Sequence, residues 1–82
     1  MYPTPEQIKA YILEGLNCTH ISLEGDGQHF FATIVSPEFV GLRPIARHQK
    51  VYAALGERMK EEIHALSFKT LTPEEFAKNS SN

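Results

Sequence analysis

Apolar residues recur at helical spacing near the start of the chain. Ile8, Ile12 and Leu16 follow one another at four-residue intervals, which places them on one face of a helix. Thr4 can cap the start of this helix, and Gln7, three residues later, completes a capping box. The pattern therefore predicts an N-terminal helix whose apolar face packs on a core.

Two strands joined by a tight turn are predicted next. Residues 20–24 alternate between polar and apolar, and residues 29–36 are rich in aromatic and β-branched side chains. The turn is expected at Gly25-Asp26-Gly27, because Asp-Gly tolerates the positive φ angles of short hairpins. Pro37 ends the second strand, since it has no N–H for the ladder. The result is an antiparallel hairpin with His29 beside its turn.

The longest predicted helix covers residues 44–62. At about 100° per residue, one face is mostly apolar with a histidine in its middle. That face carries Ile45, His48, Val51, Tyr52, Leu55 and Met59. Arg43, Arg47 and Lys50 lie on the opposite side and are called the basic strip below. A solvated helix face is the simpler explanation of this strip, and a partner surface is the alternative.

A third strand over residues 63–70 and a helix opened by Thr72 complete the order αββαβα. We expect a single α+β domain over residues 1–82. Its core would be a three-stranded mixed sheet with the helices packed on one face. The hairpin is antiparallel, and the third strand joins it after the long-helix crossover.

Composition and charge limit the partners and the cellular location that can be expected. The formal net charge is -2, which argues against nucleic acid as a partner, because phosphates are usually bound by an excess of Lys and Arg. The lone Cys18 cannot form an internal disulfide, which favours a reducing compartment. We see no apolar run long enough to cross a membrane and no secretory signal at the N-terminus. The expected location is the cytoplasm.

The four histidines are the candidate functional residues. His20 is expected to be exposed and inert, and His48 to be a neutral core residue. His29, beside the turn, and His64, at the helix-strand junction, would each be surface histidines if taken alone. Imidazoles suit zinc, copper and iron, but two ligands do not complete a tetrahedral site. Other ligands must come from this chain or from a partner, and Cys18 lies too far along the first strand.

Enzyme signatures are lacking in the sequence. It has no phosphate-binding glycine loop, no nucleophile elbow and no pair of carboxylates placed by spacing into one cleft. We therefore expect no catalytic activity.

Several segments together resemble one family. They are Gly25-Asp26-Gly27-Gln28-His29-Phe30, Phe39 with Gly41, Arg47-His48-Gln49-Lys50-Val51-Tyr52, Ile63-His64-Ala65-Leu66 and Thr72-Pro73-Glu74-Glu75-Phe76. In this order and spacing the chain resembles the BolA family, most closely its short bacterial type. Family members commonly carry tryptophan where this chain has Phe76, which is an exchange of one aromatic residue for another.

The resemblance implies a class II KH-like fold and a shared cofactor. BolA-like proteins pair with monothiol (CGFS) glutaredoxins and share a [2Fe-2S] cluster in cluster trafficking and iron homeostasis. The glutaredoxin cysteine and a glutathione thiol bind on one side. On this chain the resemblance assigns His64 and His29 as metal ligands, which makes it a histidine-type member. No cofactor is expected in the isolated chain.

The sequence is also compatible with two other functions. The first is a KH-like nucleic-acid-binding transcriptional regulator, with Arg43, Arg47 and Lys50 on the phosphates. The connector Gly41-Leu42-Arg43-Pro44 lacks the second glycine of the Gly-x-x-Gly loop, which disfavours it. The second is a structural interaction module whose partner surface is the basic strip. Whether the free chain forms a homodimer is also left open.

Overall fold

The computed structural model describes residues 4–26, 29–57 and 65–80 of the chain. Within them the elements are α1 (Pro5–Gly15), β1 (His20–Gly25), β2 (His29–Val35), the short 3-10 helix η1 (Pro37–Phe39), α2 (Pro44–Leu55), β3 (Ala65–Leu71) and α4 (Pro73–Ser80). The predicted order of helices and strands is confirmed, with η1 as an addition.

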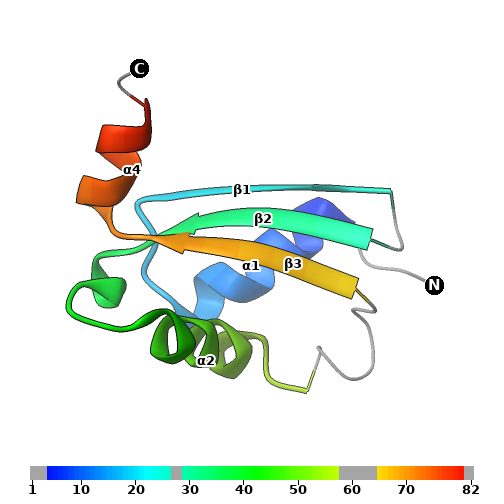
Figure 1. The fold of residues 1–82 in the computed structure, drawn as a ribbon. Coiled ribbons are helices and arrows are strands. Elements are labelled where there is room, and N and C mark those ends of the chain that lie inside the picture. Colours follow the sequence, from blue (N-terminus) through cyan, green and yellow to red (C-terminus); the bar gives the residue numbers. More distant parts are fainter. Residues whose placement is uncertain (1–3, 27–28, 58–64, 81–82) are drawn as a thin grey trace.

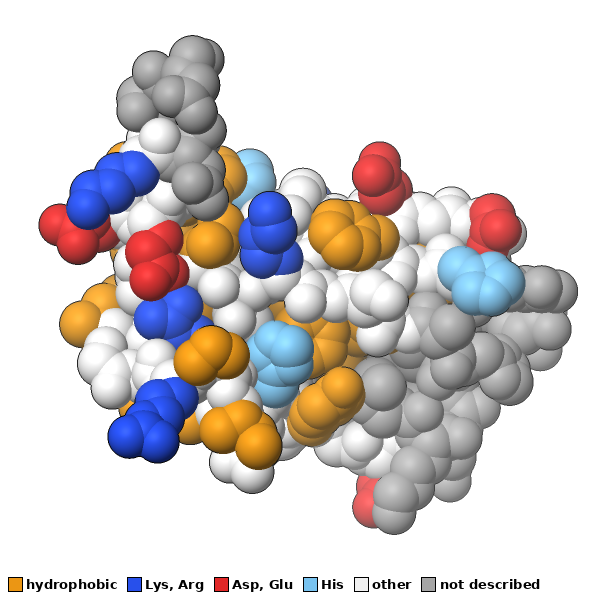
Figure 2. Space-filling model, in the orientation of Figure 1, with side chains coloured by type: hydrophobic (Ala, Val, Ile, Leu, Met, Phe, Trp, Pro, Cys, Tyr) orange, Lys and Arg blue, Asp and Glu red, His pale blue; other side chains and the backbone are white. Residues whose placement is uncertain are grey.

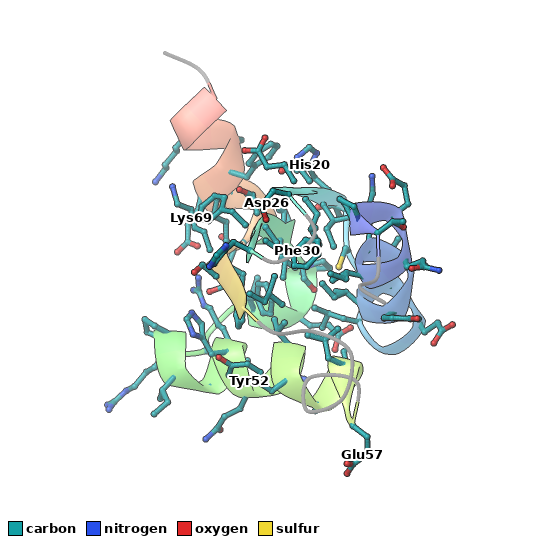
Figure 3. All side chains as sticks on the ribbon, turned by 90° about the vertical axis from the view of Figure 1, so that its right-hand side faces the viewer. His20, Asp26, Phe30, Tyr52, Glu57 and Lys69 are labelled. Atoms are coloured by element: carbon teal, nitrogen blue, oxygen red, sulfur yellow. The ribbon has the colours of Figure 1, made fainter. Side chains whose placement is uncertain are left out.

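The sheet is mixed, and β2 is its central strand. β1 pairs with β2 antiparallel, and β3 pairs with β2 parallel. Parallel strands need a crossover connection, and α2 lies in the connection between β2 and β3. Figure 3, which views the molecule along the strands, shows α1 (blue) and α2 (green) on the same side of the sheet. The α+β architecture predicted from the sequence is therefore the observed one.

The helix-covered face of the sheet is the hydrophobic core. Every second residue of β2 points into it, namely Phe30, Ala32 and Ile34, which are at most 4% exposed. The apolar face of α1 and part of α2 close over these side chains. The buried cluster is Ile8, Ile12, Leu16, Phe30, Ala32, Ile34, Phe39, Val51 and Leu55. The α1 capping box is also present, because the Thr4 side chain accepts a hydrogen bond from the Gln7 N–H and Gln7 accepts one from the Thr4 N–H.

The last helix, α4, contacts the sheet differently. Figure 1 shows it at the end of the sheet farthest from the hairpin turn, and Figure 3 shows it on the opposite side from α1. Phe76 of α4 stacks on the His20 ring with centroids 4.5 Å apart. Val35 alternates onto this face of β2 and is still fully buried. So α1 and α2 cover one face, as expected, and α4 lies over the end of the other.

The long helix is shorter than predicted. α2 ends at Leu55, because Gly56 adopts a φ of 61° and its N–H closes on the Tyr52 carbonyl. Residues 58–64, which include Met59 and His64, lie outside the described part of the chain. The predicted apolar face is also only partly covered, since Ile45 is 70% exposed. β3 is described from Ala65 to Leu71 and so runs one residue beyond its predicted end.

No helix among the described ranges is long and apolar enough to cross a membrane.

A charged contact fastens α4 to α2. The Arg47 side chain is 13% exposed, and its Nη1 lies 2.8 Å from Glu75 Oε1. Arg47 Nε also donates to the Leu42 carbonyl. Glu75 Oε1 accepts the Thr72 N–H, and the Thr72 hydroxyl accepts the Glu75 N–H, which is the capping box expected from the sequence. The Arg47 hydrogen bond, followed by that from Thr72, lowers the pKa of Glu75 to about 2.

Replacing this carboxylate should give a pH-dependent loss of stability. The pKa of Glu75 lies below its ordinary 4.5, so its contribution is fully present above about pH 4.5 and is lost as the pH falls towards 2. We expect Glu75→Gln to lower the urea midpoint at pH 7, and the difference from the parent to shrink below pH 4.5. Glu74→Gln, at the exposed neighbouring position, is the control. Equal midpoints for Glu75→Gln and the parent at pH 7 would contradict this.

Candidate functional site

Two hydrogen bonds between Asp26 and His29 close the hairpin at the candidate site. The Asp26 N–H donates to the His29 carbonyl at 3.2 Å, and the Asp26 carboxylate oxygen Oδ1 accepts the His29 N–H at 2.8 Å. Aspartate is favoured at the first position of a turn because its side chain can accept a backbone N–H in this way. Residues 27–28 lie outside the described part of the chain. Asp26 thus fixes the backbone of His29 from two sides.

Gly25 is required at the end of β1 by a close approach of β2. A Cβ atom added at Gly25 would lie 2.4 Å from the His29 carbonyl oxygen and 2.6 Å from Cδ1 of Phe30. Both distances are far below van der Waals contact, so only glycine lets the two strands pair here. The sequence suggested a turn at this point, but the close approach to His29 becomes apparent only in the structure.

His29 presents its ring to solvent. Its side chain is 76% exposed, and Nδ1 lies 3.9 Å from the second carboxylate oxygen of Asp26. As the first residue of β2, His29 shares the face opposite the core with Phe31, which is 48% exposed. Figure 3 views the molecule from this hairpin end, with Asp26 labelled. A partner can therefore reach the imidazole directly.

The parallel register brings β3 to the same end of the sheet. His29 is the register partner of Ala65, the first residue of β3. His64 directly precedes Ala65 in the sequence and lies outside the described residues. Among residues 4–26, 29–57 and 65–80, no group of three or more His, Cys, Asp or Glu side chains could hold a metal ion.

An open hollow of about 610 Å³ lies beside the His29 ring. Its described lining is Glu24, Gly25, Asp26, His29, Phe30, Phe31 and Ser67. The hollow combines carboxylates, an imidazole and an aromatic side chain, and it is bounded by all three strands of the sheet.

The other histidines and the cysteine have local roles. His20 is exposed at the far end of β1 and stacks on Phe76. His48 was predicted to be a core residue but is only half-buried, and its ring lies 4.5 Å from that of Phe68. Cys18 precedes β1 and so is separated from the hairpin turn by the whole strand. Burial, followed by the Glu38 charge, raises the pKa of its thiol.

The basic strip is largely neutralised by carboxylates. Arg47 pairs with Glu75, and Lys50 lies 3.5 Å from Glu38. The pKa of Glu38 is lowered, first by the backbone N–H of Asn17 and then by Lys50. Arg43 is exposed at the start of α2. Figure 2 shows basic and acidic side chains intermingled at the end of the molecule that carries α4. This mixture is not the continuous positive surface that phosphate binding favours.

Sequence comparison assigns the family. The family model described as BolA-like protein matches residues 13–75, which is most of the chain and includes the hairpin and β3. The chain belongs to the BolA family. Among solved structures it is similar to a BolA protein homologue from Coxiella burnetii, with 46% identity and a TM-score of 0.84. That comparison covers 92% of this chain and 97% of the other.

Named relatives span two descriptions. The chain is 32% identical to the acid stress protein IbaG of Escherichia coli K12, over 89% of this chain and 88% of that protein. It is 39% identical to the DNA-binding transcriptional regulator BolA of Haemophilus influenzae, over 78% of this chain and 62% of that protein. Against the Vibrio cholerae regulator of the same name, the match spans 49% of the relative. This BolA-family chain thus corresponds to about half to two thirds of those regulators.

A methyl group added at Gly25 should disturb the hairpin. We expect Gly25→Ala to lower the free energy of unfolding by about 1–3 kcal/mol, because the new methyl group collides with the β2 backbone. Ser22→Ala, at an exposed position of the same strand, should change it by less than about 0.5 kcal/mol. Urea denaturation of the two variants and the parent measures the difference. Equal stability of Gly25→Ala and the parent would mean that the strands separate here at no cost.

Proposed function

We propose that this BolA-family chain is an iron–sulfur adaptor that forms a [2Fe-2S]-bridged complex with a monothiol glutaredoxin. The supporting observation is the position of His29. Its imidazole is exposed at the hairpin end of the sheet, and its register partner Ala65 is the sequence neighbour of His64. The described start of β3 therefore lies at the same end of the sheet as His29.

The count of ligands supports a shared cluster. Imidazole nitrogen is a suitable ligand for iron, and an iron of the cluster needs two ligands besides its bridging sulfides. His29 and His64 supply two, and the glutaredoxin cysteine and a glutathione thiol supply those of the other iron. Two histidines on one iron resemble the Rieske arrangement, in which imidazole ligation raises the reduction potential. The chain's own part is to present and orient the two rings.

In this role the chain is an adaptor and catalyses no reaction. It acts in cluster trafficking or iron homeostasis in the cytoplasm, and it carries no cluster when isolated. The open hollow beside His29 gives the partner a concave surface that includes the exposed Phe31. Docking there would bring the partner's thiolates to the imidazoles while leaving the α1–α2 core undisturbed.

A second candidate function is transcriptional regulation through DNA. It is favoured by the relatives named DNA-binding transcriptional regulators. The net charge of -2 and the pairing of Arg47 and Lys50 with carboxylates weigh against it. Of the basic strip, Arg43 is the residue best placed to contact phosphate.

The ligand assignment predicts a spectroscopic change. The chain is mixed anaerobically with a monothiol glutaredoxin, glutathione, iron and sulfide, and visible circular dichroism is recorded with iron and sulfide contents. We expect His29→Ala and His64→Ala each to alter the spectrum and reduce the iron retained, because each removes one iron ligand. His20→Ala, at the other end of the sheet, should give the same spectrum as the parent complex. A spectrum unchanged by His64→Ala would rule out that ligand.

Nucleic-acid binding makes a different prediction. In a gel shift at physiological salt we expect no DNA binding above the non-specific level, because Arg47 and Lys50 of the basic strip are already paired with carboxylates. Arg43→Ala should then behave like the parent. A salt-resistant, sequence-dependent complex that is weakened by Arg43→Ala would instead favour the regulator.

A further inference from the structure

We propose that Asp26 is a positioning residue for His29. Its carboxylate holds the Nδ1 side of the ring and so reserves Nε2 for a metal ion. This inference rests on the proposed function, in which His29 is a cluster ligand, and it adds how the chain selects the ligating nitrogen.

One carboxylate makes both contacts. Oδ1 of Asp26 accepts the His29 N–H at 2.8 Å, and Oδ2 lies 3.9 Å from Nδ1 of the same residue. The hydrogen bond from the Asp26 N–H to the His29 carbonyl holds the two backbones together. A carboxylate with one oxygen fixed has little freedom to move the other away. The negative charge therefore stays on the Nδ1 side of the ring.

This placement selects one tautomer of the imidazole. A neutral imidazole carries a proton on one nitrogen and a lone pair on the other. A carboxylate beside Nδ1 attracts a proton there and repels a lone pair, so it favours the Nδ1–H form. At 3.9 Å the contact is an electrostatic attraction and is too long for a hydrogen bond. The lone pair is then on Nε2, the nitrogen that does not face Asp26, and the exposure of the side chain leaves it open to a metal ion. Histidines that bind metals commonly direct their other ring nitrogen at a carboxylate in this manner.

The simpler explanation is that Asp26 only stabilises the turn. Aspartate at the first position of a turn is common without any ligand nearby. Asp26→Asn separates the two roles, because the amide oxygen can still accept the His29 N–H while the charge beside Nδ1 is gone. If the amide NH₂ group then faces the ring, its N–H favours a lone pair on Nδ1, which can accept a hydrogen bond from it, and so favours the Nε2–H form. A turn residue would leave the tautomer unchanged by this substitution.

The tautomer can be measured in the isolated chain. Two-bond ¹⁵N–¹H correlations of the imidazole rings are recorded at low salt and at alkaline pH, where imidazole is neutral. We expect the Nδ1–H form to be enriched at His29 in the parent, and Asp26→Asn to shift the ratio of tautomers about two- to fivefold towards Nε2–H. The size follows from the weakness of charge pairs between exposed side chains. The His20 ring, at the far end of β1, is the internal control and should not change.

A second measurement needs no variant. Both side chains of the pair are more than 70% exposed, so salt should screen their attraction. Raising the salt concentration to about 1 M should move the parent ratio towards that of Asp26→Asn and leave Asp26→Asn itself unaffected. This arm remains informative if the substitution disturbs the turn.

The cluster-loaded complex completes the test. We expect Asp26→Asn to assemble the cluster with the glutaredoxin but to lose it several-fold faster than the parent, since part of the population presents the wrong nitrogen. A tautomer ratio insensitive to both substitution and salt, with a cluster that still depends on His29, would overturn the positioning role alone. A responsive tautomer with a cluster spectrum unchanged by His29→Ala would overturn the proposed ligand role, and the positioning role with it.

Discussion

The structure depends on the burial of one face of β2. As the central strand, β2 is hydrogen-bonded on both edges, and its residues Phe30, Ala32 and Ile34 are covered by α1 and α2. The alternation of side chains then determines the other face, where His29 and Phe31 must point away from the core. A one-residue slip of β2 would expose the core residues and bury the imidazole. The free energy that drives core formation is therefore also what presents the candidate ligand to solvent.

Electrostatics acts at both ends of the sheet, but in different ways. At the α4 end, the Arg47–Glu75 contact is partly buried, and Arg47 also donates a hydrogen bond to the Thr70 carbonyl. The Arg47 side chain thus joins α2, β3 and α4 and contributes to the fold. At the hairpin end, the Asp26–His29 contact is exposed and local. A shielded pair suits permanent attachment, whereas an exposed pair leaves the ring available for a partner. This difference explains why the basic strip makes a poor phosphate site, because its most shielded cation already holds α4 in place.

Much of the fold could be predicted from the sequence because it is encoded locally. The capping residues Thr4 and Thr72, the alternation in the hairpin and the order of elements all follow from short-range patterns. The end of α2 was predicted wrongly, because the apolar period continues through Met59 while Gly56 breaks the helix through its backbone angle. Family resemblance supplied the ligand assignments, which remain predictions.

Two features of the candidate site lay beyond the reach of sequence patterns. Periodicity indicates which face of a strand is apolar, but it does not give the register of a parallel pair, so the juxtaposition of His29 and Ala65 could not be derived. The contact between Asp26 and the His29 ring depends on the orientations of both side chains after the turn has closed. The sequence pattern therefore identified Asp26 as a turn residue but gave no indication of its contact with Nδ1 of His29.

The position of α4 relative to the hairpin has a further consequence. β2 has seven residues, and at about 3.3 Å per residue the ends of the sheet are roughly 20 Å apart. That separation is more than twice the Debye length of about 8 Å at physiological ionic strength. Salt therefore screens the charges around α4 from the imidazole of His29. Charged residues at one end of the sheet can change with little effect on the electrostatic potential at the other. In the proposed complex, a partner at the hairpin would leave the α4 end open to a second contact.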